Sequence, residues 1–323
     1  MKRITPLAVV TAFVLIVAAC GPSSGGIGTV PPIEPTPIPS TGEPSPDLTP
    51  APSPSPSLPT PSSGPSESPS PSPSPTPAGT MIVRAYFYLG GGQGTAGLVG
   101  VLREVPESKG VATAAMNALL GGPTASESAG RISSAIPAGS QLLGISIANG
   151  VATVDLSSEF ESGGGSLSVL TRLGQVVYTL TQFPTVDSVL FRIEGKTVTV
   201  FGGEGVILDG PVARSDYYDL LPAIFVDRPV WGAAIGNPAR VAGLSNVFEA
   251  TSRVALLDAA DRVIVDEMVM ATCGTGCWGT FDVTLRYDVV KAQWGTLRVY
   301  ELSARDGSPV NVRDYPVWLT PAD

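Results

Sequence analysis

A long segment of low complexity confines the folded part of this 323-residue chain to residues 80–323. Residues 21–79 consist largely of Pro, Ser, Thr and Gly, with no aromatic residues and only four charged ones. Such a composition cannot form a hydrophobic core. Proline favours the polyproline II helix, so we expect an extended stalk that reaches on the order of 150 Å. An O-glycosylated tether or a Pro-rich docking ligand has the same composition.

The N-terminus has the pattern of a secretory signal. Lys2 and Arg3 precede an apolar core at 7–17, which is shorter than a transmembrane helix. Cys20 directly follows small residues, an arrangement that resembles the lipobox of bacterial lipoproteins. The resemblance implies that Cys20 is acylated and attaches the protein to the extracytoplasmic face of the cell membrane. A plain signal peptide with a chance cysteine is the alternative.

Charge and histidine content exclude several classes of function. The chain has a formal net charge of -9, and no basic stripe offsets it locally. Nucleic acid would therefore be repelled. The chain contains no histidine, which excludes Ser-His and Cys-His catalytic couples and His-ligated metal sites. We expect a protein that is not an enzyme, with no cofactor, no metal and no nucleic-acid partner.

The two remaining cysteines, Cys273 and Cys277, lie in the sequence Cys-Gly-Thr-Gly-Cys. In an oxidising compartment such a pair most simply forms a disulfide, which contributes about 2 kcal/mol by closing a small loop. A redox centre is the alternative, although its usual spacing is CxxC. A metal site with two thiolates lacks further ligands.

The motif Gly92-x-Gly94-x-x-Gly97 has the spacing of turns that bind dinucleotides. Such a site also needs a helix directly after the glycines and a second strand that ends in an acid. Neither follows, because the next segment is short, rich in β-branched residues and stopped by Pro106. We expect a flexible glycine-rich hairpin loop between two strands, at 83–89 and 98–105.

The rest of the first folded region alternates helix and strand signals. We expect, in chain order, a helix at 109–120 capped by Ser108, strands at 142–148 and 151–156, a helix from Ser166 that stops at Phe183-Pro184, and strands at 188–193 and 196–201. The apolar face of the second helix is expected to comprise Leu167, Leu170, Gly174, Val177 and Leu180. Asn149-Gly150 favours a type I′ turn, so the strands on either side pair antiparallel. This order predicts an α+β domain with two helices over one mixed or antiparallel sheet.

Four blocks of this region resemble the GerM domain of bacterial sporulation and germination lipoproteins. They are 118–124 (ALLGGPT), 136–140 (IPAGS), 151–160 (VATVDLSSEF) and 178–184 (YTLTQFP). The resemblance spans about 83–201 and implies a role in sporulation, germination or peptidoglycan. GerM domains also occur in other envelope lipoproteins, including accessories of sensor kinases. The family is not known as catalytic, and its fold is similar to ring-building modules that pack side by side.

Asp155, Glu159 and Glu161 are the candidates for acid-base chemistry or calcium binding, because two carboxylates held close together raise the pKa of one. They lie at the end of a strand that enters a Gly-rich loop, where acids are usually solvated. We therefore expect no catalysis there. A cell-wall hydrolase that uses Asp155 and Glu159 is the alternative function.

Residues 223–320 carry strand signals alone. Apolar and polar residues alternate over 281–287, as expected of a strand with one buried face. About seven short strands separated by turns favour an immunoglobulin-like β-sandwich. Its core is expected to include Phe248, Phe281 and Val299.

Three blocks of this second region resemble the immunoglobulin-like domain of bacterial spore germination proteins. They are 246–250 (NVFEA), 279–281 (GTF) and 300–308 (YELSARDGS). That domain often follows a GerM domain, so each resemblance supports the other. Trp231, Trp278 and Trp318 are candidates for contacts with sugar rings or protein, and core packing is the alternative.

The predicted organisation divides the chain into five parts: a lipoprotein signal peptide at 1–20, a disordered stalk at 21–80, a GerM-type α+β domain at 81–205, a linker at 206–222 and an immunoglobulin-like sandwich at 223–320. We expect a non-catalytic lipoprotein that binds or assembles with envelope proteins or peptidoglycan. A ligand-sensing accessory of a membrane sensor kinase is a further alternative.

Overall fold

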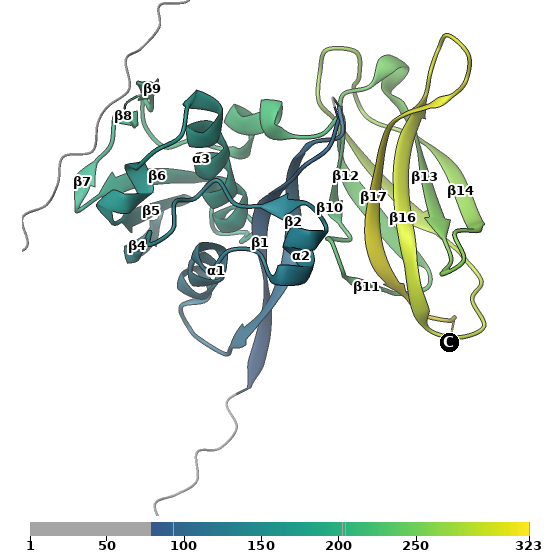
Figure 1. The fold of residues 1–323 in the computed structure, drawn as a ribbon, viewed down its shortest axis with the longest axis horizontal. Coiled ribbons are helices and arrows are strands. Elements are labelled where there is room, and N and C mark those ends of the chain that lie inside the picture. The colour runs from purple at the N-terminus through teal and green to yellow at the C-terminus, as the bar shows by residue number, and fades with distance from the viewer. Residues whose placement is uncertain (1–78, 93, 202, 204, 323) are drawn as a thin grey trace, which may run out of the picture. The chain divides into compact units, whose positions relative to one another are not determined.

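The computed structural model describes residues 79–92, 94–201, 203 and 205–322. The expected signal peptide, Cys20 and nearly all of the stalk lie outside the described residues. Within the described part of the chain, no helix has both the length and the apolar character needed to cross a membrane. The described residues belong to a single compact unit, in which an α+β domain is followed by a β domain (Figure 1).

The first domain begins with a β-hairpin. Its elements are β1 (Thr80–Leu89), β2 (Gly97–Pro106), α1 (Val111–Leu120), α2 (Ala125–Ala129), β3 (Ile132–Ser133), β4 (Leu142–Ala148), β5 (Val151–Leu156), η1 (Ser158–Glu161), α3 (Ser166–Leu180), β6 (Ser188–Ile193), β7 (Lys196–Thr197), β8 (Val200–Phe201), β9 (Val206–Ile207) and η2 (Arg214–Leu220). Strands β1 and β2 pair antiparallel along their whole length. The hairpin that the sequence predicts around the glycine motif is therefore confirmed.

The domain also contains a four-stranded sheet with the order β4-β5-β6-β7 and a separate two-stranded sheet of β8 and β9. Asn149 and Gly150 both have positive φ, as a type I′ turn requires, and β4 and β5 pair antiparallel as predicted. Strand β6 runs parallel to β5. Parallel neighbours need a long crossover connection, which α3 provides.

The helices α1 and α3 pack against each other and against both sheets (Figure 1). The sequence predicts two helices over one sheet, whereas in the structure the two helices pack against two sheets, β2-β1-β3 and β4-β5-β6-β7. The apolar face of α1 is buried as expected, with Ala115, Met116 and Leu119 inaccessible to solvent. In α3 the buried face is shifted, because Leu167 in the first turn is 65% exposed while Val169 and Leu173 are buried.

Three local expectations are wrong. Ser108 does not cap α1, which begins after Gly110, and the Ser108 hydroxyl accepts a hydrogen bond from the Gly110 N–H instead. The expected strand at 196–201 is interrupted, because β8 leaves the sheet to pair with β9. A short helix, α2, lies in a region expected to be a loop, where Thr124 and Glu127 form a capping box.

The segment predicted as a linker, 206–222, contains β9 and η2, and Tyr217 and Leu220 are buried within it.

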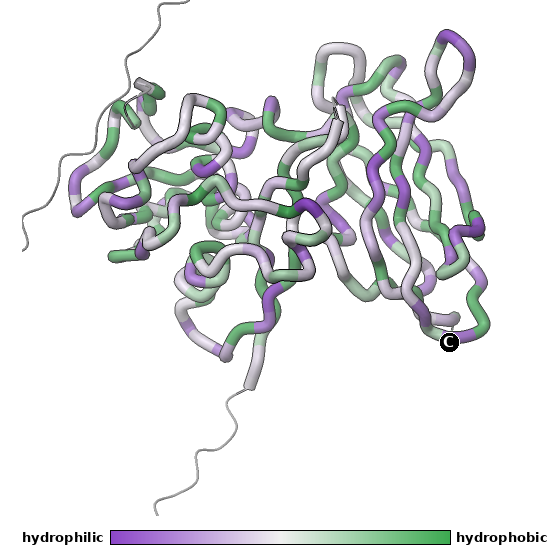
Figure 2. Tube along the Cα trace, in the orientation of Figure 1, coloured by the Kyte–Doolittle hydropathy of each residue, from purple (hydrophilic) through white to green (hydrophobic). Residues whose placement is uncertain are grey.

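The second domain is a sandwich of two sheets, with the orders β10-β12-β15 and β11-β17-β16-β13-β14. Its elements are β10 (Ile224–Arg228), β11 (Ala234–Ile235), β12 (Ala239–Ser245), η3 (Phe248–Ala250), β13 (Thr251–Leu257), β14 (Val263–Met270), β15 (Gly279–Leu285), β16 (Gln293–Leu302) and β17 (Pro309–Leu319). Hydrophobic and hydrophilic residues alternate along several of these strands (Figure 2). One face of each sheet therefore turns inward.

The core of the sandwich includes Phe281 and Val299, as predicted. Phe248 is not a core residue, because its side chain is 57% exposed. Glu249 and Ala250 adopt positive φ directly after it, so the chain turns before the strand begins at Thr251. The predicted class, an α+β domain followed by a strand-rich immunoglobulin-like domain, is confirmed.

Candidate binding site at the junction of the domains

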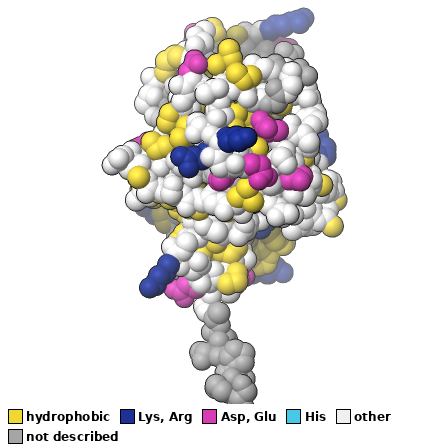
Figure 3. Space-filling view, turned by 90° about the vertical axis from the view of Figure 1, so that its left-hand side faces the viewer, with side chains coloured by type: hydrophobic (Ala, Val, Ile, Leu, Met, Phe, Trp, Pro, Cys, Tyr) yellow, Lys and Arg dark blue, Asp and Glu magenta, His cyan; other side chains and the backbone are white. Residues whose placement is uncertain are grey.

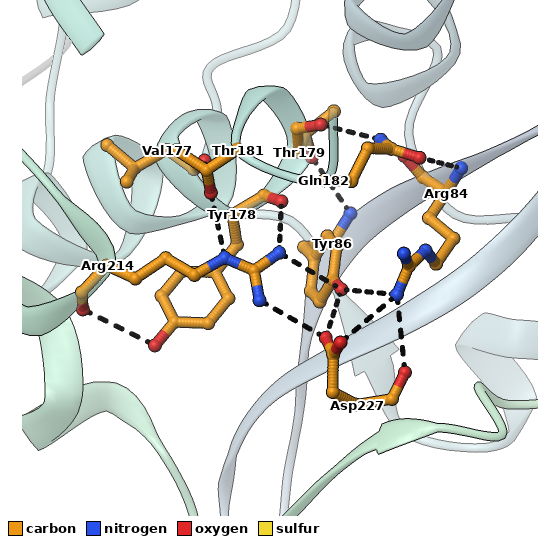
Figure 4. Close-up of polar contacts among 9 residues, drawn as sticks. All are labelled: Arg84, Tyr86, Val177, Tyr178, Thr179, Thr181, Gln182, Arg214 and Asp227. Atoms are coloured by element: carbon orange, nitrogen blue, oxygen red, sulfur yellow. Dashed lines mark hydrogen bonds and ion pairs between the residues drawn. The ribbon is translucent and has the colours of Figure 1, made fainter. Parts of the chain in front are cut away.

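The outer edge of β1 is completed by side chains of α3 and the turn after it (Figure 4). Strand β3 pairs only with the last two residues of β1. Gln182 accepts from the Arg84 N–H at 2.9 Å and donates to the Arg84 carbonyl at 2.7 Å. Thr179 accepts from the Tyr86 N–H at 3.1 Å. Because unpaired buried backbone groups are costly, these side chains replace a missing strand and hold β1 in place.

Asp227, near the end of β10, lies at the centre of a polar cluster that joins the domains (Figure 4). Its Oδ1 accepts from the Tyr86 hydroxyl at 2.6 Å. Arg84 and Arg214 form ion pairs with its two carboxylate oxygens, each at 3.3 Å. The Arg214 guanidinium also lies 4.6 Å from the centre of the Tyr178 ring. Side chains from β1 and η2 thus converge on the Asp227 carboxylate, and Tyr178 of α3 packs against Arg214.

The surroundings shift the pKa values of this Asp227 cluster in directions that keep it intact. Burial, reinforced by the charge of Asp227, raises the pKa of Tyr86 to about 12, so the hydroxyl stays protonated and donates. Burial alone would raise the pKa of Asp227, but Arg214, Tyr86 and Arg84 together hold it below its ordinary value. The carboxylate is therefore ionised at neutral pH. Neither group has the pKa near 7 that suits a proton-transfer catalyst.

The glycine-rich loop between β1 and β2 forms a second contact between the domains. Arg313 of β17 is only 3% exposed and donates to the carbonyls of Thr95 and Leu98 at 2.8 and 2.9 Å. Gly97 has a φ of +152°, and a Cβ there would lie 2.6 Å from the Leu220 carbonyl. Arg313 of the second domain therefore holds the described residues of this loop, and Gly97 is needed for close packing against Leu220.

A cleft of about 600 Å³ opens beside the Asp227 cluster, on the outer face of the β10-β12-β15 sheet. Its apolar lining includes Phe225, Ala242, Leu244 and Met270. Its charged lining consists of Arg214, Asp227, Arg228 and Asp282. We call it the junction cleft. A largely apolar cleft of this size with a few polar groups is typical of ligand sites at domain junctions.

The arrangement suits binding better than bond breaking. Asp227 and Arg214, the charged groups that the cleft shares with the cluster, are already paired with each other. Among the residues that the structure describes, no group of three or more His, Cys, Asp and Glu side chains is placed to hold a metal ion.

Two family models match the chain in the order that the fold suggests. The model of Germane, described as sporulation and spore germination, matches residues 84–199. The model of Gmad2, the immunoglobulin-like domain of bacterial spore germination, matches residues 223–308. The chain joins a GerM-type domain to an immunoglobulin-like domain of the spore germination type.

Among solved structures, this chain is similar to the GerMN domains of a sporulation protein. The first GerMN domain of the sporulation protein GerM from Bacillus subtilis is 24% identical, over 42% of this chain and 99% of that domain, with a TM-score of 0.36. The tandem GerMN domains of the same protein are 16% identical, over 64% of this chain and 62% of that structure, also with a TM-score of 0.36. A comparison with curated proteins finds no match.

The blocks that carry the GerM resemblance have structural roles in this chain. In the first block, Thr124 caps α2, and Glu127 of that helix forms an ion pair with Arg103 at 2.6 Å. In the third, Phe160 is fully buried and packs edge to face on Phe201 at 5.5 Å. The last block supplies Thr179 and Gln182, which complete the edge of β1 as described above.

The acids considered for catalysis in the GerM-type domain have other partners. Asp155 accepts a hydrogen bond from the Gly195 N–H at 2.9 Å. Glu159 is exposed in η1, and its hydrogen bond with Ser157 lowers its pKa. A general acid needs the opposite shift. On this end of the molecule, acidic and basic side chains lie close together (Figure 3).

The cysteines and tryptophans singled out from the sequence lie in or beside the second domain. The Cα atoms of Cys273 and Cys277, between β14 and β15, are 5.8 Å apart, a separation that a disulfide spans. Trp231 and Trp278 are partly buried against the hydrophobic core, which is the packing alternative. Trp318 is also partly buried and meets Trp294, which is 53% exposed, edge to face at 5.4 Å.

Sequence reasoning missed the residues that build the junction: Arg84, Arg214, Asp227 and Arg313. None of them belongs to a motif that the sequence analysis identifies. Arg84 and Asp227 are 143 positions apart, so no local spacing signals their contact. The one available signal was the block at 178–184, whose Thr and Gln side chains are unusual choices for the end of a buried helix.

Proposed function

We propose that this protein is a non-catalytic binding or assembly component of the bacterial cell envelope, with a role in sporulation, germination or a peptidoglycan-associated process. Acylation of Cys20 would attach it to the outer face of the membrane. The Pro-rich stalk would then hold the two domains away from the lipid. The Germane and Gmad2 matches support the role in sporulation or germination.

The observation that carries the proposal is the construction of the junction. The Asp227 cluster and Arg313 place charged side chains in contacts between the domains. Such contacts hold the two domains in one fixed arrangement. Preorganised surfaces of this kind favour recognition, because binding then costs little ordering entropy.

A pull-down tests this proposal. Full-length protein in detergent would be incubated with peptidoglycan sacculi and, separately, with solubilised membrane proteins. We expect specific retention of the protein on sacculi or of a membrane protein on it, and no release of muropeptides. If neither experiment shows retention, the proposal of a binding function loses its support. Release of muropeptides that stops with Asp155→Asn or Glu159→Gln would establish the hydrolase instead.

The anchor is tested separately by fractionation. We expect the wild-type protein in the membrane fraction and Cys20→Ala in the soluble extracytoplasmic fraction. Equal membrane association of both proteins would contradict acylation at Cys20.

The junction cleft favours a second candidate, a ligand-sensing accessory of a membrane sensor kinase. A ligand that binds only the folded state raises stability by RT ln(1 + [L]/Kd). This role predicts that a small molecule from the growth medium raises the melting temperature of the purified protein. An assembly component would show no such shift.

A further inference from the structure

Two tryptophans lie side by side on the surface of the second domain. Trp294 of β16 and Trp318 of β17 are opposite each other in the register of these neighbouring strands and meet edge to face at 5.4 Å (Figure 1). Trp294 is 53% exposed, and Trp318 is partly exposed. The exposed part of an aromatic pair leaves water only when a ligand or partner covers it, so such a pair marks a candidate binding surface.

This surface continues along β16. Leu297 and Val299 are inaccessible to solvent and face the core of the sandwich. Side chains alternate along a strand, so Arg298 and Tyr300 lie on the same outer face as Trp294. Trp294 and Tyr300 are six positions apart, which is about 20 Å along a strand. We call the outer face of β16 from Trp294 to Tyr300, with Trp318 beside it, the aromatic row.

The charged side chains at the aromatic row are paired with one another. Arg298 donates from Nε and Nη2 to the carboxylate of Asp314 at 2.7 and 2.8 Å. Asp266 accepts from Arg253 at 2.9 Å and from the Tyr300 hydroxyl at 2.7 Å. These two pairs leave no excess of either charge. They keep hydrogen-bonding capacity, because Nη1 of Arg298 has no hydrogen bond within the described residues and a carboxylate oxygen accepts more than one.

A sugar chain fits this combination of groups. A pyranose ring with equatorial substituents has an apolar face of C–H groups, which packs on the negative face of an aromatic ring. Its hydroxyl groups donate and accept, so they match an arginine paired with an aspartate. A protein interface favours an apolar core depleted of charged residues, whereas here Arg298 and Asp314 separate the tryptophans from Tyr300. A β-1,4 linkage keeps successive sugar rings in an extended ribbon that follows a strand.

We propose that the aromatic row binds the glycan strand of peptidoglycan through its sugar rings. Trp294 stacks on one ring and is held in place by Trp318. Arg298 and Asp314 bind hydroxyl groups, and Tyr300 contacts a ring further along the chain. The proposal rests on the envelope-binding function proposed above and names the surface and the ligand.

The test compares two uncharged hexasaccharides. Chitohexaose is a β-1,4-linked chain of N-acetylglucosamine, and maltohexaose has an α-1,4 linkage that coils the chain. Each would be titrated by calorimetry into the full-length protein in a detergent without sugar groups. We expect chitohexaose to bind with a Kd of about 1 mM or lower and maltohexaose at least about ten-fold more weakly. Peptide-free glycan strands, released from sacculi by an amidase, should bind at least as tightly as chitohexaose.

Three variants identify the surface. Trp294→Ala should weaken the binding of chitohexaose at least about ten-fold, because the stacking ring is lost. Trp294→Tyr keeps an aromatic ring and should lose less than about three-fold. Leu167→Ala is the matched control, because Leu167 is 65% exposed in the first domain, and it should bind as the wild type does. Circular dichroism and melting temperature would establish that the variants are folded.

Four results would overturn the proposal: equal binding of the two hexasaccharides, undiminished binding by Trp294→Ala, no binding of chitohexaose at millimolar concentration, and no binding of the peptide-free glycan strands. A membrane protein that is retained by the wild type but not by Trp294→Ala, without glycan binding, would assign the aromatic row to a protein partner instead.

The pull-down separates this proposal from the proposed function. If it succeeds equally with the wild type and Trp294→Ala, the glycan assignment is wrong and the envelope-binding function stands. If it fails for the wild type while chitohexaose and the free strands bind, the ligand assignment holds and binding in the intact envelope does not.

Discussion

Asp227 is the side chain on which the junction depends most. Asp227→Asn would leave Arg84 and Arg214 facing a neutral amide. We expect a loss of about 2 kcal/mol in the free energy of unfolding at neutral pH, less than for a fully buried pair because the carboxylate is 25% exposed. Urea denaturation measures the loss. Asp219→Asn, an exposed acid of η2, is the control and should change stability by less than about 0.5 kcal/mol.

The same carboxylate predicts a dependence on pH. The folded state holds the pKa of Asp227 below its ordinary value of 3.8. Its contribution is therefore complete above that value and is lost as the pH falls through the lower, folded-state pKa. We expect the stability difference between wild type and Asp227→Asn to be constant from about pH 8 to 5 and to shrink below about pH 4. A difference that stays constant down to pH 2 would contradict this assignment.

Cys273 and Cys277 are expected to form a disulfide in protein kept under oxidising conditions. Iodoacetamide should label neither residue until a reductant is added, and peptide mass spectrometry would locate the label. Reduction should lower the free energy of unfolding by about 2 kcal/mol, as the closure of a short loop allows. Labelling of both thiols in untreated protein, produced under oxidising conditions, would show that the pair is not bonded.

Among the elements, the β1–β2 loop contains a glycine, Gly97, that the packing of the chain requires. Gly97→Ala would force a Cβ against the Leu220 carbonyl at a residue with positive φ. We expect a loss of about 2–4 kcal/mol, measured by chemical denaturation. Gly92→Ala is the matched control from the same motif, because its Cβ would meet only Thr95 at 3.9 Å. Equal effects of the two changes would contradict the packing role.

Elements with local signals were predicted well. Gly121-Gly122-Pro123 ends α1 and Asn149-Gly150 turns β4 into β5 because these residues limit the backbone without help from distant contacts. The interruption after β7 was missed, since it depends on pairing between β8 and β9. The exposure of Phe248 was missed for a related reason, as two non-glycine residues with positive φ follow it.

For the whole molecule, the junction predicts that the two domains unfold together. Scanning calorimetry of the wild type should show one transition. Arg313→Ala would leave the carbonyls of Thr95 and Leu98 without their buried donor, and we expect the transition to fall in temperature and split in two. A single transition at an unchanged temperature would contradict the coupling.

Arg298→Ala is the control for this experiment. Arg298 lies on the exposed face of the same sheet, and its ion pair with Asp314 is open to solvent. Surface pairs contribute about 0–1 kcal/mol, so the transition should stay single and move little.

The order of residues along the chain was enough to establish two domains, their classes and most of their strands and helices. Periodicity, turn residues and composition act over a few positions, and the physics behind them is local. The resemblance to GerM-type and immunoglobulin-like domains also came from short blocks, and the family matches agree with it.

The junction needed the folded chain. Arg84 meets Asp227 across 143 positions, and Arg313 meets Leu98 across 215. Contacts between residues so far apart leave no regular spacing in the sequence that could predict them, because only the packing of the folded chain selects the partner of each charged side chain. The junction cleft also needed the folded chain, because its lining brings Arg214 of η2 beside residues of β10, β12 and β15 that lie far apart in the sequence.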